Sequence, residues 1–130
     1  MSGARRGPET GPVLLADTGV VAGADSQAAG ALWRLEEQPR DLDANIIAIP
    51  PEGRIDTHDG PAIDVLIHIL AGSGQVRGPS GSVPLRPGAL VWLPRGSRRT
   101  FDAGPQGLRY LTVHQRKQGL SLGATRSSEQ

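Results

Sequence analysis

Histidines are the side chains of this sequence best suited to acid–base or metal chemistry, because imidazole titrates near neutral pH and readily binds metals. They are His58, His68 and His114, and the chain has no cysteine. That absence excludes a thiolate metal site, a cysteine nucleophile and a disulfide scaffold. The sequence also lacks a nucleophile elbow, a P-loop, a dinucleotide fingerprint and a His-Glu-x-x-His pair. Histidines, carboxylates and arginines therefore remain as the groups that could bind or react.

Strand alternation places two of the histidines relative to their neighbours. His58 shares a face with Asp56 and Gly60, because side chains two residues apart point the same way in a strand. His68 stands between two isoleucines, so we expect it on the face opposite to theirs, packed on another sheet or a subunit. His114 ends an apolar run, and which face it takes is left open. If His114 points inward, His58 and His114 could form a relocated two-histidine site.

The elements that position these residues are short apolar runs, which recur roughly every 8–12 residues from residue 44 onward. The 18 glycines and 11 prolines fall between the runs and indicate turns. A chain of 130 residues has room for one domain. We predict an all-β fold whose closure into a barrel hides the strand edges. The expected strands span residues 45–49, 54–58, 65–70, 74–77, 82–85, 89–93, 98–102 and 108–115.

The two ends of the chain lack a sustained hydrophobic period. We predict that residues 1–29 form a flexible tail or a dimer arm, that residues 30–116 form the barrel, and that residues 117–130 form a second flexible tail. Residues 27–37 suit either a short helix or an edge strand. No apolar run approaches the roughly 20 residues of a membrane span, and no apolar region follows Arg5 and Arg6. We therefore expect a cytoplasmic protein without a membrane partner.

The net charge of +1 gives no sign of a polyanion partner, but the charges are unevenly distributed. Acidic residues dominate residues 36–64, and arginines dominate residues 77–117. We expect the two halves to attract each other or an identical partner. A nucleic-acid surface is not expected, because the basic half lacks interleaved aromatic residues and a helix that could enter a groove.

Glycine and proline positions between residues 51 and 99 resemble those of the cupin superfamily. Pro51-Glu52-Gly53, then His58, then Gly72-Ser73-Gly74 resembles the first cupin motif. Residues 86–96, with a Pro-Gly turn at one end and Pro-Arg-Gly at the other, resemble the second. The resemblance covers about residues 44–116. It implies a small single-domain cupin-like jelly-roll β-barrel, or double-stranded β-helix, that pairs as a homodimer.

Counting from the motif glycines carries the metal ligands of the family over to this chain. His58 matches the first histidine, whereas Gly60, Val65 and Arg99 stand at the second histidine, the glutamate and the last histidine. Asp64 falls one residue from the glutamate position and therefore on the other face. A divalent cation needs three or four converging donors, and a guanidinium adds positive charge. The resemblance thus implies a metal-independent barrel without a cofactor.

The same register points Arg99 into the barrel beside Phe101. A buried guanidinium needs an anion, which is either Asp56 or Asp64 or an anionic ligand. Trp92 suits either core packing or the floor of a pocket. We predict that the barrel binds a small polar or anionic ligand, with His58 and Arg99 as its converging polar groups. The candidate ligand-binding residues are His58, Arg99, Asp56, Trp92 and His114.

Two enzyme hypotheses stay open beside binding. In the first, His58 is the general base and Arg99 stabilises an oxyanion in a metal-free isomerase, epimerase or cyclase. In the second, a dioxygenase-like metal enzyme draws relocated ligands from His58, His114 and Asp64. Metal analysis of protein purified without chelator would separate the metal-dependent hypothesis from the others.

Overall fold

A computed structural model of the chain describes residues 11–23, 25 and 27–116. The predicted tail at residues 117–130 and the first ten residues of the predicted tail at 1–29 lie outside the described residues. Among the described residues, no helix is long and apolar enough to cross a membrane. The elements are α1 (Thr18–Ala22), β1 (Gly30–Arg34), β2 (Leu42–Ile49), β3 (Arg54–Asp59), β4 (Val65–Gly78), β5 (Gly81–Leu85), β6 (Leu90–Leu93) and β7 (Arg98–Gln115).

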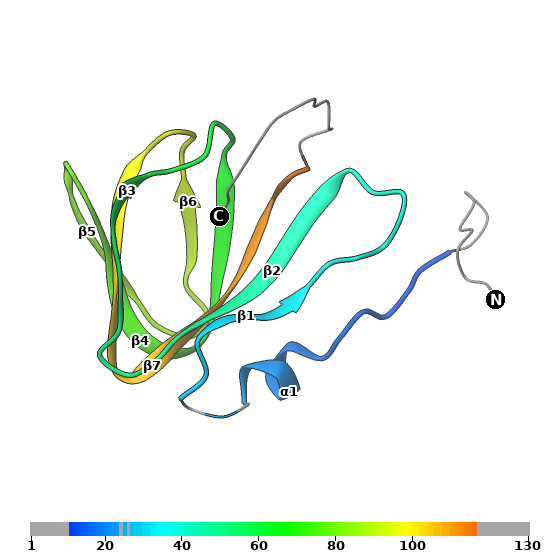
Figure 1. The fold of residues 1–130 in the computed structure, drawn as a ribbon, viewed down its shortest axis with the longest axis horizontal. Helices are drawn as coiled ribbons and strands as arrows, with labels where there is room; N and C mark the ends of the chain where they lie inside the picture. The colour runs from blue at the N-terminus through cyan, green and yellow to red at the C-terminus, as the bar shows by residue number, and fades with distance from the viewer. Residues whose placement is uncertain (1–10, 24, 26, 117–130) are drawn as a thin grey trace.

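The antiparallel strands form two walls that face each other (Figure 1). The first wall contains β1, β2, β6, residues 65–69 of β4 and residues 108–115 of β7. The second wall contains β3, β5, residues 74–78 of β4 and residues 98–103 of β7. Residues 60–64 and 94–97 connect the walls at one end, which we call the rim. The predicted all-β jelly-roll barrel is confirmed.

The long strands β4 and β7 bend from one wall into the other, where the sequence predicted turns at residues 71–74 and 103–107. Both segments are instead continuous strand. Gly72 and Gly107 have positive φ values of 82° and 79°. A Cβ atom at Gly72 would collide with the carbonyl oxygen of Gly107, so the two strands touch through bare backbone. The glycines mark a bend in paired strands rather than a hairpin.

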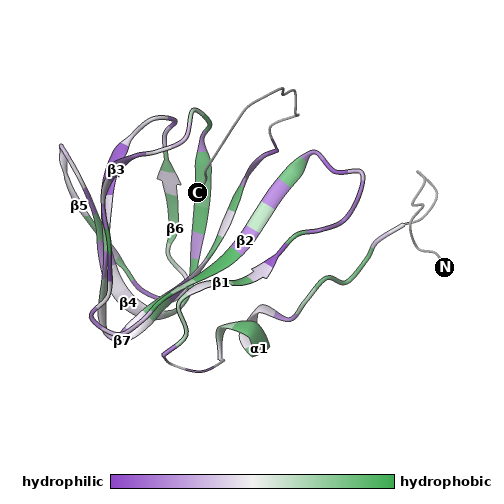
Figure 2. Ribbon diagram, in the orientation of Figure 1, coloured by the Kyte–Doolittle hydropathy of each residue, from purple (hydrophilic) through white to green (hydrophobic). Residues whose placement is uncertain are grey.

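The space between the walls is filled by a hydrophobic core. Side chains two residues apart on β4, such as Val65, Ile67 and Ile69, are all buried. Phe101 of the second wall stacks on Tyr110 of the first, with ring centroids 5.3 Å apart and planes 4° apart. Figure 2 shows hydrophobic stretches on β4 and β6, whereas much of β3 is hydrophilic. The core therefore lies below the rim, between the first wall and the centre of the second.

A short helix packs on the outer face of the first wall, within the segment predicted as a tail or dimer arm. Asp17 caps α1 by accepting hydrogen bonds from the N–H groups of Gly19 and Val20. The buried Arg109 of β7 donates to the carbonyl oxygens of Ala22 at 2.9 Å and Asp25 at 2.5 Å. Residues 30–34 then form an edge strand, which resolves the alternatives left open for residues 27–37.

Candidate functional site

Gly60, which directly follows β3, and Arg99 of β7 lie next to each other at the rim. His58 is paired with Arg99 across the two strands, and the N–H of Gly60 donates to the carbonyl oxygen of Ser97 at 2.9 Å. A Cβ atom at Gly60 would collide with the guanidinium of Arg99. The missing side chain at residue 60 thus leaves the space that the arginine occupies.

Arg99 is the most unusual charged group of the described residues. Arg99 is only 7% exposed. This burial lowers the pKa of its guanidinium, and the nearby Tyr110 partly offsets the decrease. Its Nη1 donates to Ser97 Oγ at 2.8 Å and more weakly to Ser97 O at 3.4 Å. Its buried Nε has no hydrogen-bond partner within the described part of the chain. No carboxylate among the described residues forms an ion pair with it.

Asp56 and Asp64, the expected carboxylate partners of Arg99, contact other arginines instead. The prediction that one of them pairs with Arg99 is therefore wrong. Asp64 accepts a hydrogen bond from the Arg95 N–H at 3.0 Å and lies 3.5 Å from the Arg95 guanidinium. Asp56 lies 4.0 Å from Arg54. Arg95 and Asp64 do join the basic half to the acidic half, as expected from the charge distribution.

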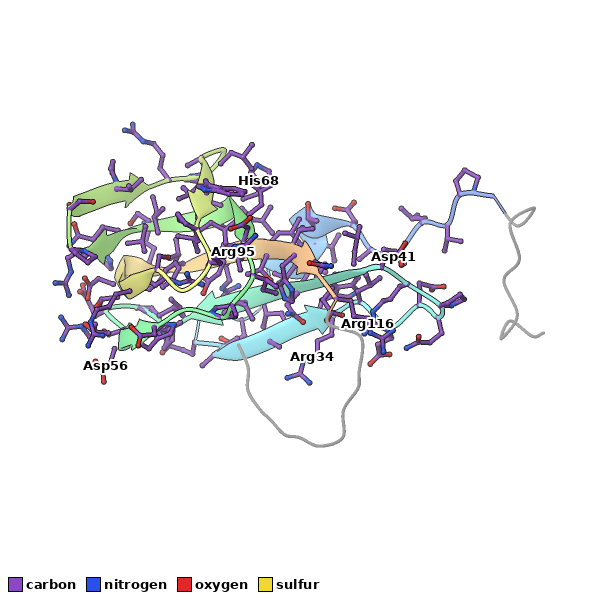
Figure 3. The ribbon with its side chains drawn as sticks, turned by 90° about the horizontal axis from the view of Figure 1, so that it is seen from above. Arg34, Asp41, Asp56, His68, Arg95 and Arg116 are labelled. Carbon is purple, nitrogen blue, oxygen red and sulfur yellow. The ribbon has the colours of Figure 1, made fainter. Side chains whose placement is uncertain are left out.

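A β-bulge explains why Asp56 misses the inner face. The register of β3 against β7 shifts between Ile55, which packs against the core, and His58. In between, the hydroxyls of Thr57 and Thr100 share a hydrogen bond, and Asp56 points away from the molecule (Figure 3). The prediction that Asp56 shares a face with His58 is therefore corrected.

His58 lies at the edge of the site rather than inside it. Its side chain is exposed, and its Nδ1 lies 2.8 Å from the carbonyl oxygen of Asp56. Across the barrel rim, no carboxylate of the described residues orients its ring. His58 can therefore contact a bound molecule but is not assembled as a general base.

The first wall contributes a polar band above the core at the same rim. His114 is paired with Asp43 on β2 and with Val65 on β4, and Thr112 is paired with Asn45. These residues share the face of Tyr110, which is in the core, so His114 faces inward. Its Nδ1 lies 2.9 Å from the carbonyl oxygen of Gln115.

Two further groups at the site were missed by the sequence reasoning. Tyr110 is buried, and burial raises its pKa above the usual range, although the nearby charge of Arg99 acts in the opposite direction. Arg40 holds Asp43 through two hydrogen bonds of 3.1 and 2.9 Å. The parity of β7 would have identified Tyr110, because it lies four residues before His114.

Trp92 lies on the outer face of the first wall, away from the other candidates. Its neighbour Leu93 is in the core, and Trp92 itself is 59% exposed opposite Leu66. The prediction that it packs in the core or floors the pocket is corrected. His68 is on the same outer face, as expected, and its partners are Leu90 and Leu111.

The donor set at the rim does not fit a divalent cation. Among the described residues, no group of three His, Cys, Asp or Glu side chains is close enough to hold a metal. The guanidinium of Arg99 lies against Gly60 and adds a positive charge there. The relocated set of His58, His114 and Asp64 is not assembled, because Asp64 is bound by Arg95.

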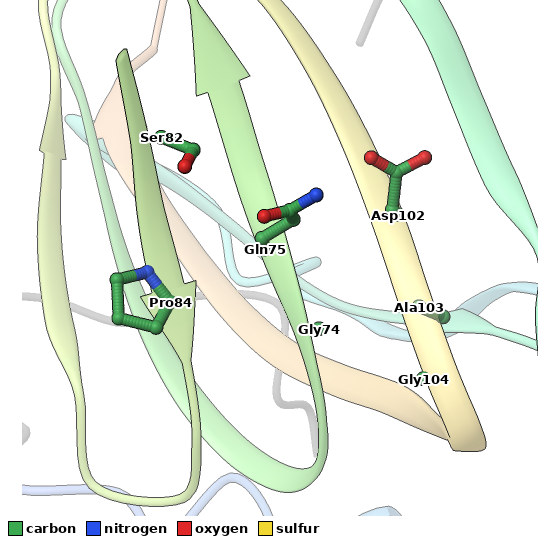
Figure 4. Close-up of a pocket in the computed structure, with 7 residues that line it drawn as sticks. All are labelled: Gly74, Gln75, Ser82, Pro84, Asp102, Ala103 and Gly104. Carbon is green, nitrogen blue, oxygen red and sulfur yellow. The ribbon is translucent and has the colours of Figure 1, made fainter.

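A hollow of about 320 Å³ lies on the outer face of the second wall, behind the core (Figure 4). Its lining consists of Gly74, Gln75, Ser82, Pro84, Asp102, Ala103 and Gly104. Asp102 lines it and is held by Arg54 at 3.0 Å and Arg77 at 2.7 Å. The hydrogen bond from Arg77 is the main reason why the pKa of Asp102 is lowered.

Comparison with known proteins finds likeness in structure alone. No family model and no curated protein matches the chain. The cupin domain of Schizosaccharomyces pombe Cnp3 aligns with a TM-score of 0.58 and 15% identity, over 65% of this chain and 63% of that one. The polyketide cyclase RemF from Streptomyces resistomycificus gives 0.55 and 24%, over 61% and 57%.

A longer alignment is found with the protein BH2720 from Bacillus halodurans. Its TM-score is 0.67 at 12% identity, and it covers 86% of this chain and 87% of that one. The aligned region is less than two thirds of the Cnp3 domain and of RemF. At these identities the likeness establishes how the chain folds.

Proposed function

Because the chain has the cupin fold but carries an arginine at a position where cupins hold a metal ligand, we propose that it binds a small anionic ligand at the rim. The observation that carries the proposal is the burial of Arg99 without a carboxylate partner among the described residues. Burying a cation costs on the order of several kcal/mol unless an opposite charge compensates for the lost hydration. A carboxylate or phosphate of a ligand would supply that charge.

The geometry also limits the kind of anion. Arg99 uses Nη1 on Ser97 and leaves Nε without a partner, so a carboxylate or phosphate could engage the remaining donors of the guanidinium. Since the residue is only 7% exposed, the anionic group must be small or stand at the end of a narrow molecule.

The polar band of the first wall would contact the rest of the ligand. Thr112, Asn45 and His114 face inward above the core, and His58 is exposed at the opposite wall. These groups can both donate and accept hydrogen bonds, which suits a ligand with hydroxyl or carbonyl groups beside its anionic end. We assign His58 this contact role rather than that of a base, because no carboxylate of the residues that the structure describes orients its ring.

Thermal unfolding in the presence of defined anions tests the proposal. The probes are inorganic phosphate and mono- and dicarboxylates from acetate to citrate, with the corresponding amides as neutral controls. A ligand at 100 times its Kd stabilises the folded state by about 2.7 kcal/mol, which raises the Tm measurably. We expect a saturable rise with at least one anion class and none with the amides.

Two matched arginine variants locate the binding. Arg99→Met should abolish the anion-dependent rise in Tm, whereas Arg54→Met, on the outer face, should retain it. The proposal is wrong if no anion raises the Tm, or if Arg99→Met responds as the unmodified chain does.

A further inference from the structure

The free hydrogen-bond donors of Arg99 lie along one edge of its guanidinium. Nη1 is occupied by Ser97, whereas Nε and Nη2 donate to no group of the residues that the structure describes. Nε and Nη2 belong to one planar fork, and each directs an N–H bond to the same side. The edge that remains is therefore a pair of parallel donors, which matches the two oxygens of a carboxylate.

The position of Gly60 shows that this edge is the one a ligand could use. A Cβ atom at Gly60 would lie closest to Nη1, Cζ and Nη2 of Arg99. The backbone at Gly60 therefore covers the end of the guanidinium formed by Nη1 and Nη2. The edge formed by Nε and Nη2 lies to the side of this contact, so a bound group can approach it without displacing Gly60.

The charge at this part of the rim matches an anion with a single charge. The two neighbouring arginines are already paired, Arg95 with Asp64 at 3.5 Å and Arg98 with Asp59 at 2.9 Å. Only the charge of Arg99 is left without a carboxylate within residues 94–99. A carboxylate supplies one negative charge, whereas a phosphate monoester carries about −1.5 to −2 near neutral pH.

Tyr110 offers a further hydrogen-bond donor beside Arg99. Arg99 and Phe101 share the inner face of β7, and Tyr110 stacks on Phe101 with ring centroids 5.3 Å apart. The Tyr110 residue is only 4% exposed, and its hydroxyl forms no hydrogen bond with the part of the chain that the structure describes. Burial raises its pKa, so the hydroxyl keeps its proton at neutral pH. A buried tyrosine hydroxyl usually has a partner, which a ligand oxygen would provide here.

We propose that the rim binds a carboxylate, which Nε and Nη2 of Arg99 hold through two parallel hydrogen bonds and to which the Tyr110 hydroxyl donates a third. This inference rests on the proposed binding of an anion at the rim, and it adds the chemical class of the anion and one specificity residue. The guanidinium uses the facing lone pairs of the two oxygens, and the remaining lone pairs are free to accept from a hydroxyl.

Anions that share one organic part test the chemical class. Propionate, ethanesulfonate and ethylphosphonate differ only in the acidic group, and benzoate, benzenesulfonate and phenylphosphonate repeat the comparison with a larger body. We expect each carboxylate to bind the full chain about tenfold or more tightly than its sulfonate and phosphonate, measured by the dependence of Tm on anion concentration. The sulfonate has a single charge on three oxygens, so it separates the effect of shape from that of charge.

The result for these series distinguishes this inference from the binding proposal. If a sulfonate or phosphonate binds as tightly as its carboxylate and Arg99→Met abolishes that binding, anion binding at the rim stands and the carboxylate assignment is overturned. If no anion of either series raises the Tm, the carboxylate assignment is also overturned. The broader set of phosphate and mono- and dicarboxylates then decides the binding proposal by itself.

Two conservative variants test the individual contacts. Arg99→Lys keeps the positive charge but removes the planar fork, so it should weaken carboxylate binding about tenfold or more. Tyr110→Phe removes only the hydroxyl and should weaken binding about tenfold. Ser82→Ala removes an exposed hydroxyl on the outer face of the second wall and is the matched control, which should bind as the unmodified chain does. Unchanged affinity in Arg99→Lys or in Tyr110→Phe overturns the proposal.

Nuclear magnetic resonance gives a readout that a purely structural role of Tyr110 would not move. Tyr110 is the only tyrosine of the chain, so labelling tyrosine with ¹³C at Cζ yields a single resonance beside the hydroxyl. We expect this resonance to shift on titration with the tighter-binding carboxylate, with the same Kd that the Tm values give. The shift should persist in Ser82→Ala and disappear in Arg99→Met. A resonance that stays in place at saturation overturns the contact with Tyr110 and with it the proposal.

Discussion

Arginines on the two faces of the second wall are handled in opposite ways. On the outer face, Arg54 and Arg77 share the carboxylate of Asp102 and remain partly in water. On the inner face, Arg99 is almost fully buried, and its hydrogen bonds to the described residues go to Ser97 alone. The outer arginines have a structural explanation within the chain. The inner arginine does not, and this difference is what directs the functional proposal to the rim.

Replacing the inner and the outer arginine by methionine should change stability in opposite directions. We expect Arg99→Met to stabilise the unliganded fold by about 1–3 kcal/mol, because it removes a buried cation without a carboxylate partner. Arg77→Met should destabilise it, because Asp102 loses its shorter ion pair. Urea unfolding in a chloride buffer measures both. Equal destabilisation by the two variants would show that Arg99 is satisfied within the chain.

The space at Gly60 offers a way to move Arg99 without removing it. We expect Gly60→Ala to displace the guanidinium and to weaken anion binding about tenfold, or about 1.4 kcal/mol. Titration calorimetry with the anion that gives the largest rise in Tm measures the effect. Pro61→Ala, one residue further on, is the control and should bind as the unmodified chain does. Unchanged affinity in Gly60→Ala would place the anion elsewhere.

Neutralising the shared carboxylate should affect stability but not binding. Asp102→Asn is expected to cost about 1 kcal/mol at neutral pH, because exposed ion pairs contribute little. The pKa of Asp102 is lowered in the folded state, so its stabilisation is present above its ordinary pKa of about 4 and is lost as the pH falls through the lowered value. Urea unfolding at pH 7 and at pH 2 should show the difference from the unmodified chain shrinking at the lower pH.

Removing one of the two outer arginines should have the smallest effect. Arg54→Gln leaves the Arg77–Asp102 pair intact, so we expect a loss of at most about 0.5 kcal/mol. The loss should fade in 1 M salt, which screens exposed charges. A larger effect that persists at high salt would mean that Arg54 contributes through packing.

The glycines and prolines of the sequence predicted the barrel because they mark where strands start, bend and stop. Counting from them also assigned Gly60 and Arg99 to ligand positions of the cupin motifs, and the structure shows these two residues next to each other. Glycine alone, however, does not distinguish a hairpin from a bend, so the continuity of β4 through Gly72 was missed. That distinction depends on whether the partner strand also continues, which a local pattern does not contain.

The errors at the site have similar causes. Alternation from His58 back to Asp56 assumes an unbroken strand, and the bulge after Ile55 breaks it. For Trp92, alternation shows that its side chain and that of Leu93 point to opposite faces of the sheet, but not which of the two faces the core. The hydrogen bonds from Arg109 to the carbonyl oxygens of Ala22 and Asp25 join segments far apart in the chain, and no sequence pattern predicts them.

The continuity of β4 and β7 has a consequence for how the protein folds. Because β4 and β7 each contribute residues to both walls, neither wall can form completely without the other. Most pairings also join distant segments, such as β2 with the end of β7, and non-local pairing slows folding to a scale of about milliseconds to seconds. We expect the walls to form together in a single cooperative transition, without an intermediate in which one wall stands alone.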